Sequence, residues 1–354
     1  MDDFRAVREL LPPPPLDPGV EQAGRERLGR AFAQERQVRR TRRGRWSAAG
    51  VALLGAAAAA AVVMTSAPPV ARQVTPPAGV ATLAADRMLL AAAETVARQP
   101  DEGAWWGSTL VNGREFDDPE HRYRLRQSES AEVWIPADPE ARTWYRTTYL
   151  GAEPASEQDK AAWQAAGSPA SWTYGGQTPG LVTRERARGV VSGAPGEAET
   201  WSSEDWDFRV VLAGRPLTKM GDVPDTPEGL RALFGAGVDE RALADNVVRL
   251  LVYAPVTSGT RAAAYRLLAS LPGVTAAGRV TDVLGRPGDG LEYRSGELPV
   301  TGYAGETRTR LVIDPATGKP LSIETRTAQD GRLLEYTAIR ESVWTDHNPL
   351  KETK

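Results

Sequence analysis

The chain has 354 residues, 41% of them hydrophobic, and a formal net charge of −3. It has no cysteine, which excludes disulfides, thiolate nucleophiles and Cys-ligated metal sites. Residues 1–45 hold 11 arginines and 7 acidic residues, while residues 46–354 hold 32 basic and 39 acidic residues. That larger, acidic part lacks the basic face that nucleic-acid binding needs, so this class of partner is excluded.

Residues 1–45 are predicted to form a basic helical segment. Hydrophobic residues at helical spacing precede the extended run Pro12–Pro15, and Asp17-Pro18 is a typical helix start. The apolar stripe that follows is too thin for an independent core. We therefore expect either a solvated stem or a helix that contacts a cytoplasmic protein partner.

Residues 46–66 are predicted to form a transmembrane helix. From Trp46 to Ala71 no side chain is ionisable, and 21 helical residues reach about 31 Å, the thickness of a bilayer's hydrocarbon core. Cations crowd the N-terminal flank, whereas Arg72 stands alone on the other side, which predicts a cytoplasmic N-terminus. The flanking residues are Arg39, Arg40, Arg42, Arg43, Arg45 and the interfacial Trp46.

Two other interpretations of this segment fit the sequence less well. A buried alanine-rich helix of a soluble protein would rarely avoid charge for so long. A cleaved signal peptide would need a charged region of some 45 residues, far beyond the usual length. The anchor is therefore favoured, with the lipid bilayer as a partner and the larger domain outside the plasma membrane.

The rest of the chain is predicted to hold a Pro-rich tether at 67–80 and an extracytoplasmic domain at 81–354. A helix is expected over Thr82–Gln99. Short strands are then expected at Trp105–Asn112, Arg122–Ser128, Ala131–Ile135 and Arg142–Tyr149. Residues 151–199 are predicted to be a long loop with one short helix near Lys160–Ala166, followed by a strand at Phe208–Leu212.

The C-terminal part is predicted to start with helices and end with strands. Residues 225–271 are helical, with starts at Thr226-Pro227, Asp239 and Ser258. Strands follow at Val274–Leu284, Leu291–Arg294, Thr307–Ile313, Leu321–Arg326 and Arg332–Val343. Asp314-Pro-Ala-Thr-Gly318 is predicted to be a tight hairpin turn.

This order of elements predicts an α+β fold: one curved antiparallel sheet with helices packed on its inner face. Such a sheet leaves a concave space, so we expect an apolar or amphipathic ligand between helices and sheet.

No constellation of residues predicts catalysis, a cofactor or a metal ion. The two histidines, His121 and His347, lie in no helical metal-binding pair, and no Gly-x-Ser-x-Gly elbow is present. The glycines at 285, 288 and 290 are not followed by the Lys-Ser/Thr of a phosphate loop. We therefore expect that the protein is not an enzyme.

Nine of the ten tryptophans follow the predicted membrane segment. Those on strands are expected to fill the core of the sheet. Trp163, Trp172 and Trp201 lie in the loop-rich stretch and are the candidates for contact with a ligand or partner.

Several stretches carry a resemblance to a known family: Leu10-Leu-Pro-Pro-Pro-Pro15, the Arg-flanked Ala-rich helix, Leu268-Ala-Ser-Leu-Pro-Gly273, Val280-Thr-Asp-Val-Leu-Gly-Arg-Pro-Gly288 and Leu311-Val-Ile-Asp-Pro-Ala-Thr-Gly-Lys-Pro-Leu321. Over most of its length the chain resembles a family of uncharacterised single-pass membrane proteins of high-GC (actinomycete) bacteria. Their genes are often neighbours of those for extracytoplasmic-function sigma factors, which implies a place in envelope signalling. The helix, strands and Ile-Asp-Pro-x-Thr-Gly-x-Pro-Leu hairpin also resemble the half-barrel of lipoprotein carriers.

Three functional hypotheses remain open from the sequence. The first is a membrane-anchored extracytoplasmic binding or sensing protein, in which the outer domain receives a ligand. The second is a carrier or scaffold for envelope lipid or cell-wall material. The third is an exported hydrolase.

Overall fold

The computed structural model describes residues 78–138, 141–175, 189–203, 222–235, 237–295, 303 and 305–346. Contacts group the chain into two units, Met1–Arg72 and Gln73–Lys354, and all described residues belong to the second. The basic segment 1–45, the predicted membrane helix 46–66, the strand predicted at Phe208–Leu212 and His347 lie outside the described residues.

The described residues contain five helices, and four of them pack together at one end of the sheet. Their bounds are α3 Ala78–Val96, α4 Glu157–Ala165, α5 Pro227–Phe234, α6 Glu240–Tyr253 and α7 Ser258–Ala269. Side-chain oxygens of Thr226, Asp239 and Thr257 accept hydrogen bonds from the first turns of α5, α6 and α7. The predicted starts of α5 and α6 are confirmed. For α7 the predicted cap at Ser258 is wrong by one residue.

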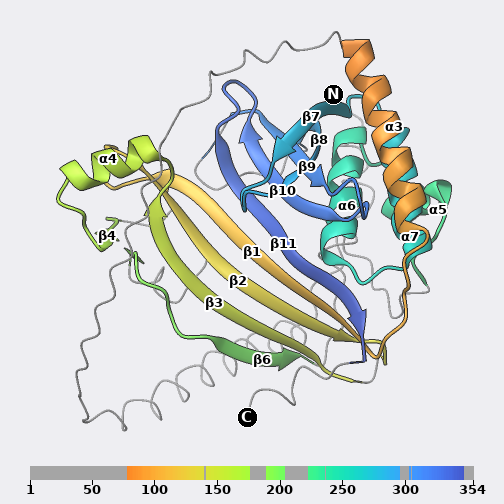
Figure 1. Ribbon diagram of the computed structural model, residues 1–354, viewed down its shortest axis with the longest axis horizontal. Helices are drawn as coiled ribbons and strands as arrows, with labels where there is room; N and C mark the ends of the chain where they lie inside the picture. The colour runs from red at the N-terminus through yellow and green to blue at the C-terminus, as the bar shows by residue number, and fades with distance from the viewer. Residues whose placement is uncertain are drawn as a thin grey trace, which may run out of the picture. The chain divides into compact units, whose positions relative to one another are not determined.

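Nine strands form one antiparallel sheet in the order β6-β3-β2-β1-β11-β10-β9-β8-β7 (Figure 1). Their bounds are β1 Trp105–Asp117, β2 Arg124–Pro136, β3 Thr143–Pro154, β6 Glu199–Ser203, β7 Thr275–Thr281, β8 Pro287–Arg294, β9 Thr307–Ile313, β10 Pro320–Thr327 and β11 Leu333–Thr345. Two further strands, β4 Ser171–Thr173 and β5 Val190–Ser192, pair with each other. The predicted α+β class with a large antiparallel sheet is confirmed.

The larger hydrophobic core lies between the helices and one face of the sheet, called here the inner face. Helices α3, α5, α6 and α7 pack there against side chains of β1, β2, β8 and β9, among them Trp106, Ile135, Leu291 and Leu311. The opposite face is called the outer face. Alternation along each strand places every second side chain on it.

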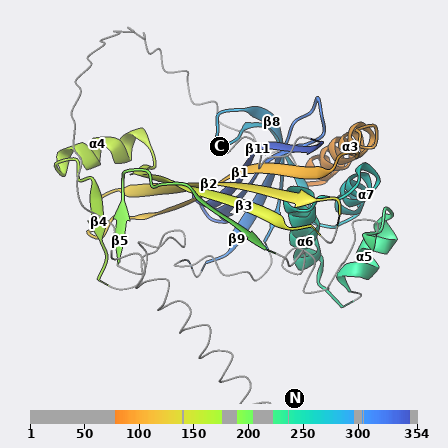
Figure 2. The ribbon, with the colours of Figure 1, turned by 90° about the horizontal axis from the view of Figure 1, so that it is seen from below.

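A second, smaller core lies at the far end of the long strands. Helix α4 and the β4–β5 pair lie at that end, away from α3, α5, α6 and α7, in both views of the ribbon (Figures 1 and 2). The cluster consists of Phe116, Tyr123, Leu125, Ala152, Trp172 and Val191.

Three further predictions need correction. The strands expected at 122–128 and 131–135 are one strand, β2, because Ser128, Glu129 and Ser130 pair with β1 on one side and β3 on the other. The long loop expected at 151–199 is shorter, since β3 runs to Pro154 and residues 157–192 contain α4, β4 and β5. The tether expected at 67–80 ends early because α3 starts at Ala78, directly after a proline, which favours a helix start.

Candidate ligand cavity

A cavity of about 300 Å³ lies between helices α3, α6 and α7 and strands β10 and β11. This volume is at the lower end of the range of small-molecule sites. Its apolar wall consists of Val96, Leu251, Val252, Pro320, Leu321, Ile339 and Val343. Its charged lining consists of Arg261, Arg286, Asp314, Lys319, Arg340 and Glu341. The space therefore combines an apolar wall with a cationic side.

Arg261 reaches the cavity from the first turn of α7. The turn is fixed by Thr257, whose Oγ1 accepts the backbone N–H of Thr260 at 3.1 Å. The Oδ2 of Asp101 accepts the backbone N–H of Ser258 at 2.5 Å. A cation in the first turn of a helix is opposed by the helix dipole. Local helix stability therefore gives no reason for an arginine at this place.

Lys319 reaches the cavity from the hairpin between β9 and β10. The turn is closed within itself, since Asp314 accepts hydrogen bonds from the backbone N–H of Ala316 at 2.9 Å and the hydroxyl of Thr317 at 2.8 Å. Gly318 has a φ of +67°, a left-handed conformation that favours glycine, and the predicted tight hairpin turn is confirmed. This turn directs the next residue, Lys319, toward β11, where its Nζ donates to the Ser342 carbonyl at 3.1 Å.

Two hydrogen bonds tie this hairpin to the helices. The amide of Gln99 donates to the Thr317 carbonyl at 2.7 Å, and the buried hydroxyl of Tyr265 donates to the Gly318 carbonyl at 2.7 Å. Because Tyr265 lies one turn after Arg261 on α7, the second bond fixes the hairpin relative to α7. The positions of Lys319 and Arg261 are thus set by the same contacts.

Burial disfavours the charged forms of both Arg261 and Lys319. Burial lowers the pKa of Lys319 from 10.5, and the nearby Arg261 charge lowers it further, against an opposing effect of Glu341. Burial also lowers the pKa of the Arg261 guanidinium, with the Asp101 charge acting in the opposite direction. The Arg261 guanidinium has no hydrogen bond or ion pair with any described residue. An anion in the cavity would relieve both effects.

Arg286 lines the same cavity, but its guanidinium already has an ion pair and two hydrogen bonds to carbonyls. Its guanidinium contacts the buried Asp282 carboxylate at 2.6 Å and donates to the carbonyls of Leu321 and Ile339 at 2.8 and 2.7 Å. These bonds tie the loop between β7 and β8 to β10 and β11. Arg286 therefore forms part of the wall.

The three tryptophans singled out in the sequence do not line this cavity. Trp172 is buried in the smaller core, where its Nε1–H donates to the Tyr123 hydroxyl at 2.8 Å. Trp163 packs against the same core and donates to the Pro169 carbonyl at 3.0 Å. Trp201 lies on the edge strand β6, is 45% exposed and stacks on Tyr145 with ring centroids 5.4 Å apart. Trp201 is the most accessible of the three.

The described part of the chain contains neither a metal-binding cluster nor a helix that could span a bilayer. No group of three or more His, Asp or Glu side chains gathers there as a metal site would require. His121 is exposed, and its Nδ1 lies 3.5 Å from the Asp117 carboxylate. None of the helices described is both long and apolar enough to cross a bilayer. The predicted span at 46–66 falls outside those helices.

Sequence reasoning did not single out Arg261 or Lys319. One signal was available: Arg261 stands in an alanine-rich helix whose other residues are mostly buried, at the end where the dipole disfavours a cation. No sequence signal joins it to Lys319, 58 positions later.

Comparison with known proteins gives distant structural likenesses only. No protein-family model and no curated protein matches the chain. Among solved structures, the Pseudomonas aeruginosa MucA/MucB complex is similar at 12% identity and a TM-score of 0.28, over 77% of this chain and 61% of that one. The chain thus spans about three fifths of that relative. A DUF1329 family protein from Desulfovibrio piger is similar at 10% identity and a TM-score of 0.19, over 73% of this chain and 90% of that one. Likenesses this distant do not bear on function, and the family resemblance stays a prediction from sequence.

Proposed function

We propose that the unit Gln73–Lys354 is a binding domain for an amphiphile with an acidic headgroup, in a membrane-anchored extracytoplasmic binding or sensing protein. One observation carries the proposal: the helix–sheet cavity has an apolar wall and two poorly compensated cations, Arg261 and Lys319. An apolar tail would lie against Leu251, Ile339 and Val343. A carboxylate or phosphate would accept hydrogen bonds from the two cations.

The proposal assigns binding and not catalysis to this site. The cavity offers donors and apolar surface, which suffice to hold an amphiphile. Its two carboxylates, Asp314 and Glu341, have other roles in this account. Asp314 closes the hairpin turn, and Glu341 favours the charged form of Lys319.

Binding of decanoate to the purified full-length chain, measured by equilibrium dialysis, tests the proposal. Decanol, which has the same tail and no charge, is the ligand control. We expect the wild type to prefer decanoate and the double variant Arg261→Met/Lys319→Met to lose at least about tenfold in decanoate affinity, because hydrogen bonds to charged groups contribute about 1.5–3 kcal/mol each. Methionine keeps the length of the side chains and removes their charge.

The matched control is Arg87→Met/Arg241→Met, which removes two exposed cations outside the cavity. It should bind decanoate like the wild type. Equal decanoate binding by all three proteins, or an equal preference for decanol, would refute an anion site in this cavity.

The membrane anchor is part of the proposal and rests on the sequence of residues 39–66. Alkaline phosphatase fused after residue 80 and after residue 354 should be active in both places if the chain leaves the cytoplasm at the predicted helix. Inactive enzyme in both fusions would remove the anchor. A mature N-terminus between Ala67 and Arg72 would instead mean that the segment is a cleaved signal.

A further inference from the structure

The outer face of the sheet carries a row of arginines on three neighbouring strands. The register places Arg294 of β8 opposite Arg308 of β9, and Arg308 opposite Arg326 of β10. Neighbouring strands lie about 4.8 Å apart, and like charges in directly opposed positions are destabilising. This repulsion calls for a reason beyond the stability of the sheet.

Two of these three arginines are neutralised and one is not. Arg294 pairs with Glu306. Arg326 pairs with the buried Glu324 at 2.7 Å. Arg308 is exposed and has no hydrogen bond or ion pair with a described residue.

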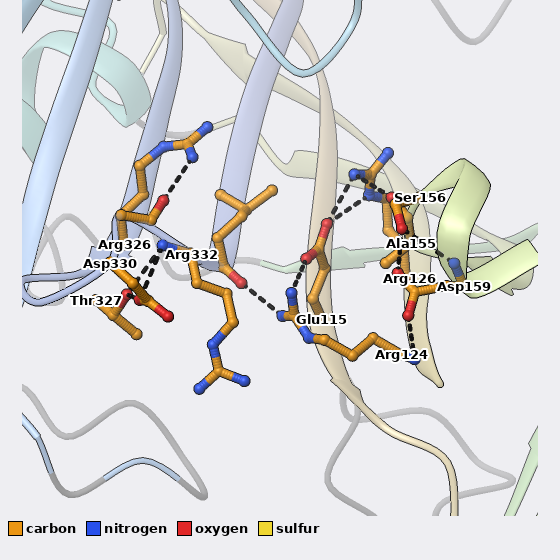
Figure 3. Close-up of polar contacts among 12 residues, drawn as sticks. Glu115, Arg124, Arg126, Ala155, Ser156, Asp159, Arg326, Thr327, Asp330 and Arg332 are labelled. Carbon is orange, nitrogen blue, oxygen red and sulfur yellow. Dashed lines mark hydrogen bonds and ion pairs between the residues drawn. The ribbon is translucent and has the colours of Figure 1, made fainter. Parts of the chain in front are cut away.

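Arg332, between β10 and β11, places a second free guanidinium beside the row. Its backbone N–H is held by the Thr327 hydroxyl at 2.9 Å and by the Asp330 carboxylate at 3.3 Å. Its guanidinium lies 6.0 Å from the centre of the Tyr303 ring and has no hydrogen bond or ion pair within the described part of the chain. Figure 3 shows its side chain between the turn at Asp330 and the side chain of Arg124, with no dashed line to the guanidinium.

The strands on the other side of Arg332 add to the positive charge. Arg124 and Arg126 share one carboxylate, that of Glu115, at 3.0 and 2.7 Å (Figure 3). Arg124 also donates to the Leu333 carbonyl at 2.8 Å, which brings it next to Arg332. Glu153 of β3 lies opposite Arg126 in the register, so Arg124, Arg126 and Arg332 together face the two carboxylates of Glu115 and Glu153 at this end.

We name the whole set the arginine band. It contains Arg124, Arg126, Arg294, Arg308, Arg310, Arg326 and Arg332, with Glu115, Glu292, Glu306, Glu324 and Asp330 as the carboxylates in contact with them or with their turn. With Glu153, which lies opposite Arg126 in the register, seven cations face six anions, in a chain whose net charge is −3.

We propose that the arginine band binds phosphate groups of a multivalent phosphate ligand, with Arg308 and Arg332 as its primary contacts. The planar guanidinium fork matches phosphate in a bidentate way, and arginine is favoured over lysine where such recognition is needed. Arg308 and Arg332 belong to β9 and to the turn before β11, with β10 between them. The whole band runs from β2 to β8, five strand spacings of about 4.8 Å each, so one small anion would cover only part of it, whereas a ligand with several phosphates would follow it.

The test compares full-length variants in binding to inorganic polyphosphate and to phosphatidylglycerol vesicles, with phosphatidylcholine vesicles as the neutral surface. The double variant Arg308→Gln/Arg332→Gln removes two charges that have no hydrogen bond or ion pair with a described residue, together with the contact of Arg332 with the Tyr303 ring. We expect it to lose at least about tenfold in affinity, the effect of one lost hydrogen bond to a charged group or more. Arg98→Gln/Arg241→Gln removes two exposed charges elsewhere and should bind like the wild type.

The arginines at 39–45 contribute equally to every variant, so the comparison between the two double variants is decisive. Loss with polyphosphate alone identifies a soluble phosphate chain as the ligand source, and loss with the phosphatidylglycerol vesicles as well identifies a lipid headgroup. Equal binding by the two double variants would overturn the proposal. Poly-glutamate binding as tight as polyphosphate, with the same loss, would overturn it in favour of an acidic peptide.

Thermal melting and a second variant serve as controls for correct folding. Arg308→Gln/Arg332→Gln should melt at or above the wild-type temperature, because it relieves like-charge repulsion. Arg308→Lys/Arg332→Lys keeps both charges and loses the fork geometry. It should bind more tightly than the glutamine variant and more weakly than the wild type. Lysine and glutamine variants of equal affinity would contradict a site that recognises charge.

Discussion

Two of the hydrophobic cores described on this sheet are built differently, and the cavity described above borders the larger one. The larger core is formed mainly by leucine, valine and alanine of four helices against the inner face, and the cavity with Arg261 and Lys319 lies at its border. The smaller core is rich in aromatic rings whose polar atoms are satisfied, as in the bond between Trp172 and Tyr123. Aromatic content thus marks the core in which Trp172 is buried and hydrogen-bonded, whereas buried charge marks the cavity with Arg261 and Lys319.

The largest expected effect is a loss of stability, and it should differ between a buried and an exposed leucine of the helices. Leu250 on α6 is fully buried in the larger core, and Leu83 on α3 is 61% exposed. Leu250→Ala should lower the free energy of unfolding by about 3–4 kcal/mol, while Leu83→Ala should change it by about 0.5 kcal/mol or less. Chemical denaturation measures both. Similar losses for the two variants would contradict the assignment of the buried face of the helices.

The next largest loss of stability is expected in the hairpin that carries Lys319. Gly318 and Gly331 both have positive φ, +67° and +69°. A Cβ on Gly318 would lie 2.8 Å from the Ala92 carbonyl oxygen, whereas one on Gly331 would meet nothing within 4 Å. Gly318→Ala should therefore cost about 2–3 kcal/mol and Gly331→Ala about 1 kcal/mol. Thermal melting of the two variants tests this, and equal costs would mean that the hairpin does not pack on α3.

A smaller effect is expected in the aromatic core. Trp172→Phe keeps a buried ring and removes the donor to Tyr123, which should cost about 1–2 kcal/mol. Because this core lies at the other end of the sheet, decanoate affinity should not change. A loss of decanoate binding in this variant would show that the two ends are coupled.

The smallest effect is a pH dependence caused by Lys319. Its lowered pKa means that the native state releases this proton at a lower pH than the unfolded chain does, where the value is 10.5. Between the two values the unfolded state binds more protons, so stability rises with pH in the range just below 10.5. Lys319→Met should flatten this rise in denaturation curves, and decanoate affinity of the wild type should fall over the same range. A variant with the same slope as the wild type would exclude Lys319 as its source.

The order of the elements was predictable because local signals define it. Thr226-Pro227 and Asp239 are good helix starts, and the turn at Asp314–Gly318 has proline and glycine where a tight hairpin needs them. The continuity of β2 was not predictable, because Ser128–Ser130 lacks strand propensity and is held by pairing on both sides. Pairing of distant strands overrides local preference.

The existence of a candidate site was predictable from the sequence, but the residues that line it were not. A space between helices and sheet follows from the order of elements, but its lining does not. Arg261 depends on the packing of α7 against the hairpin, and Lys319 on the bond between Tyr265 and Gly318. Contacts of this kind join residues more than 50 positions apart and leave no periodic pattern in the sequence. The predicted contacts Trp163, Trp172 and Trp201 stay a prediction for a different surface.

Hydrogen–deuterium exchange of the full-length chain with and without saturating decanoate tests the central claim most directly, because it locates the ligand. We predict added protection in the first turn of α7, in residues 314–319 and in residues 339–343, with none in α4, β4 or β5. Protection confined to the smaller core or to β6 around Trp201, with no change at Arg261 and Lys319, would contradict the account.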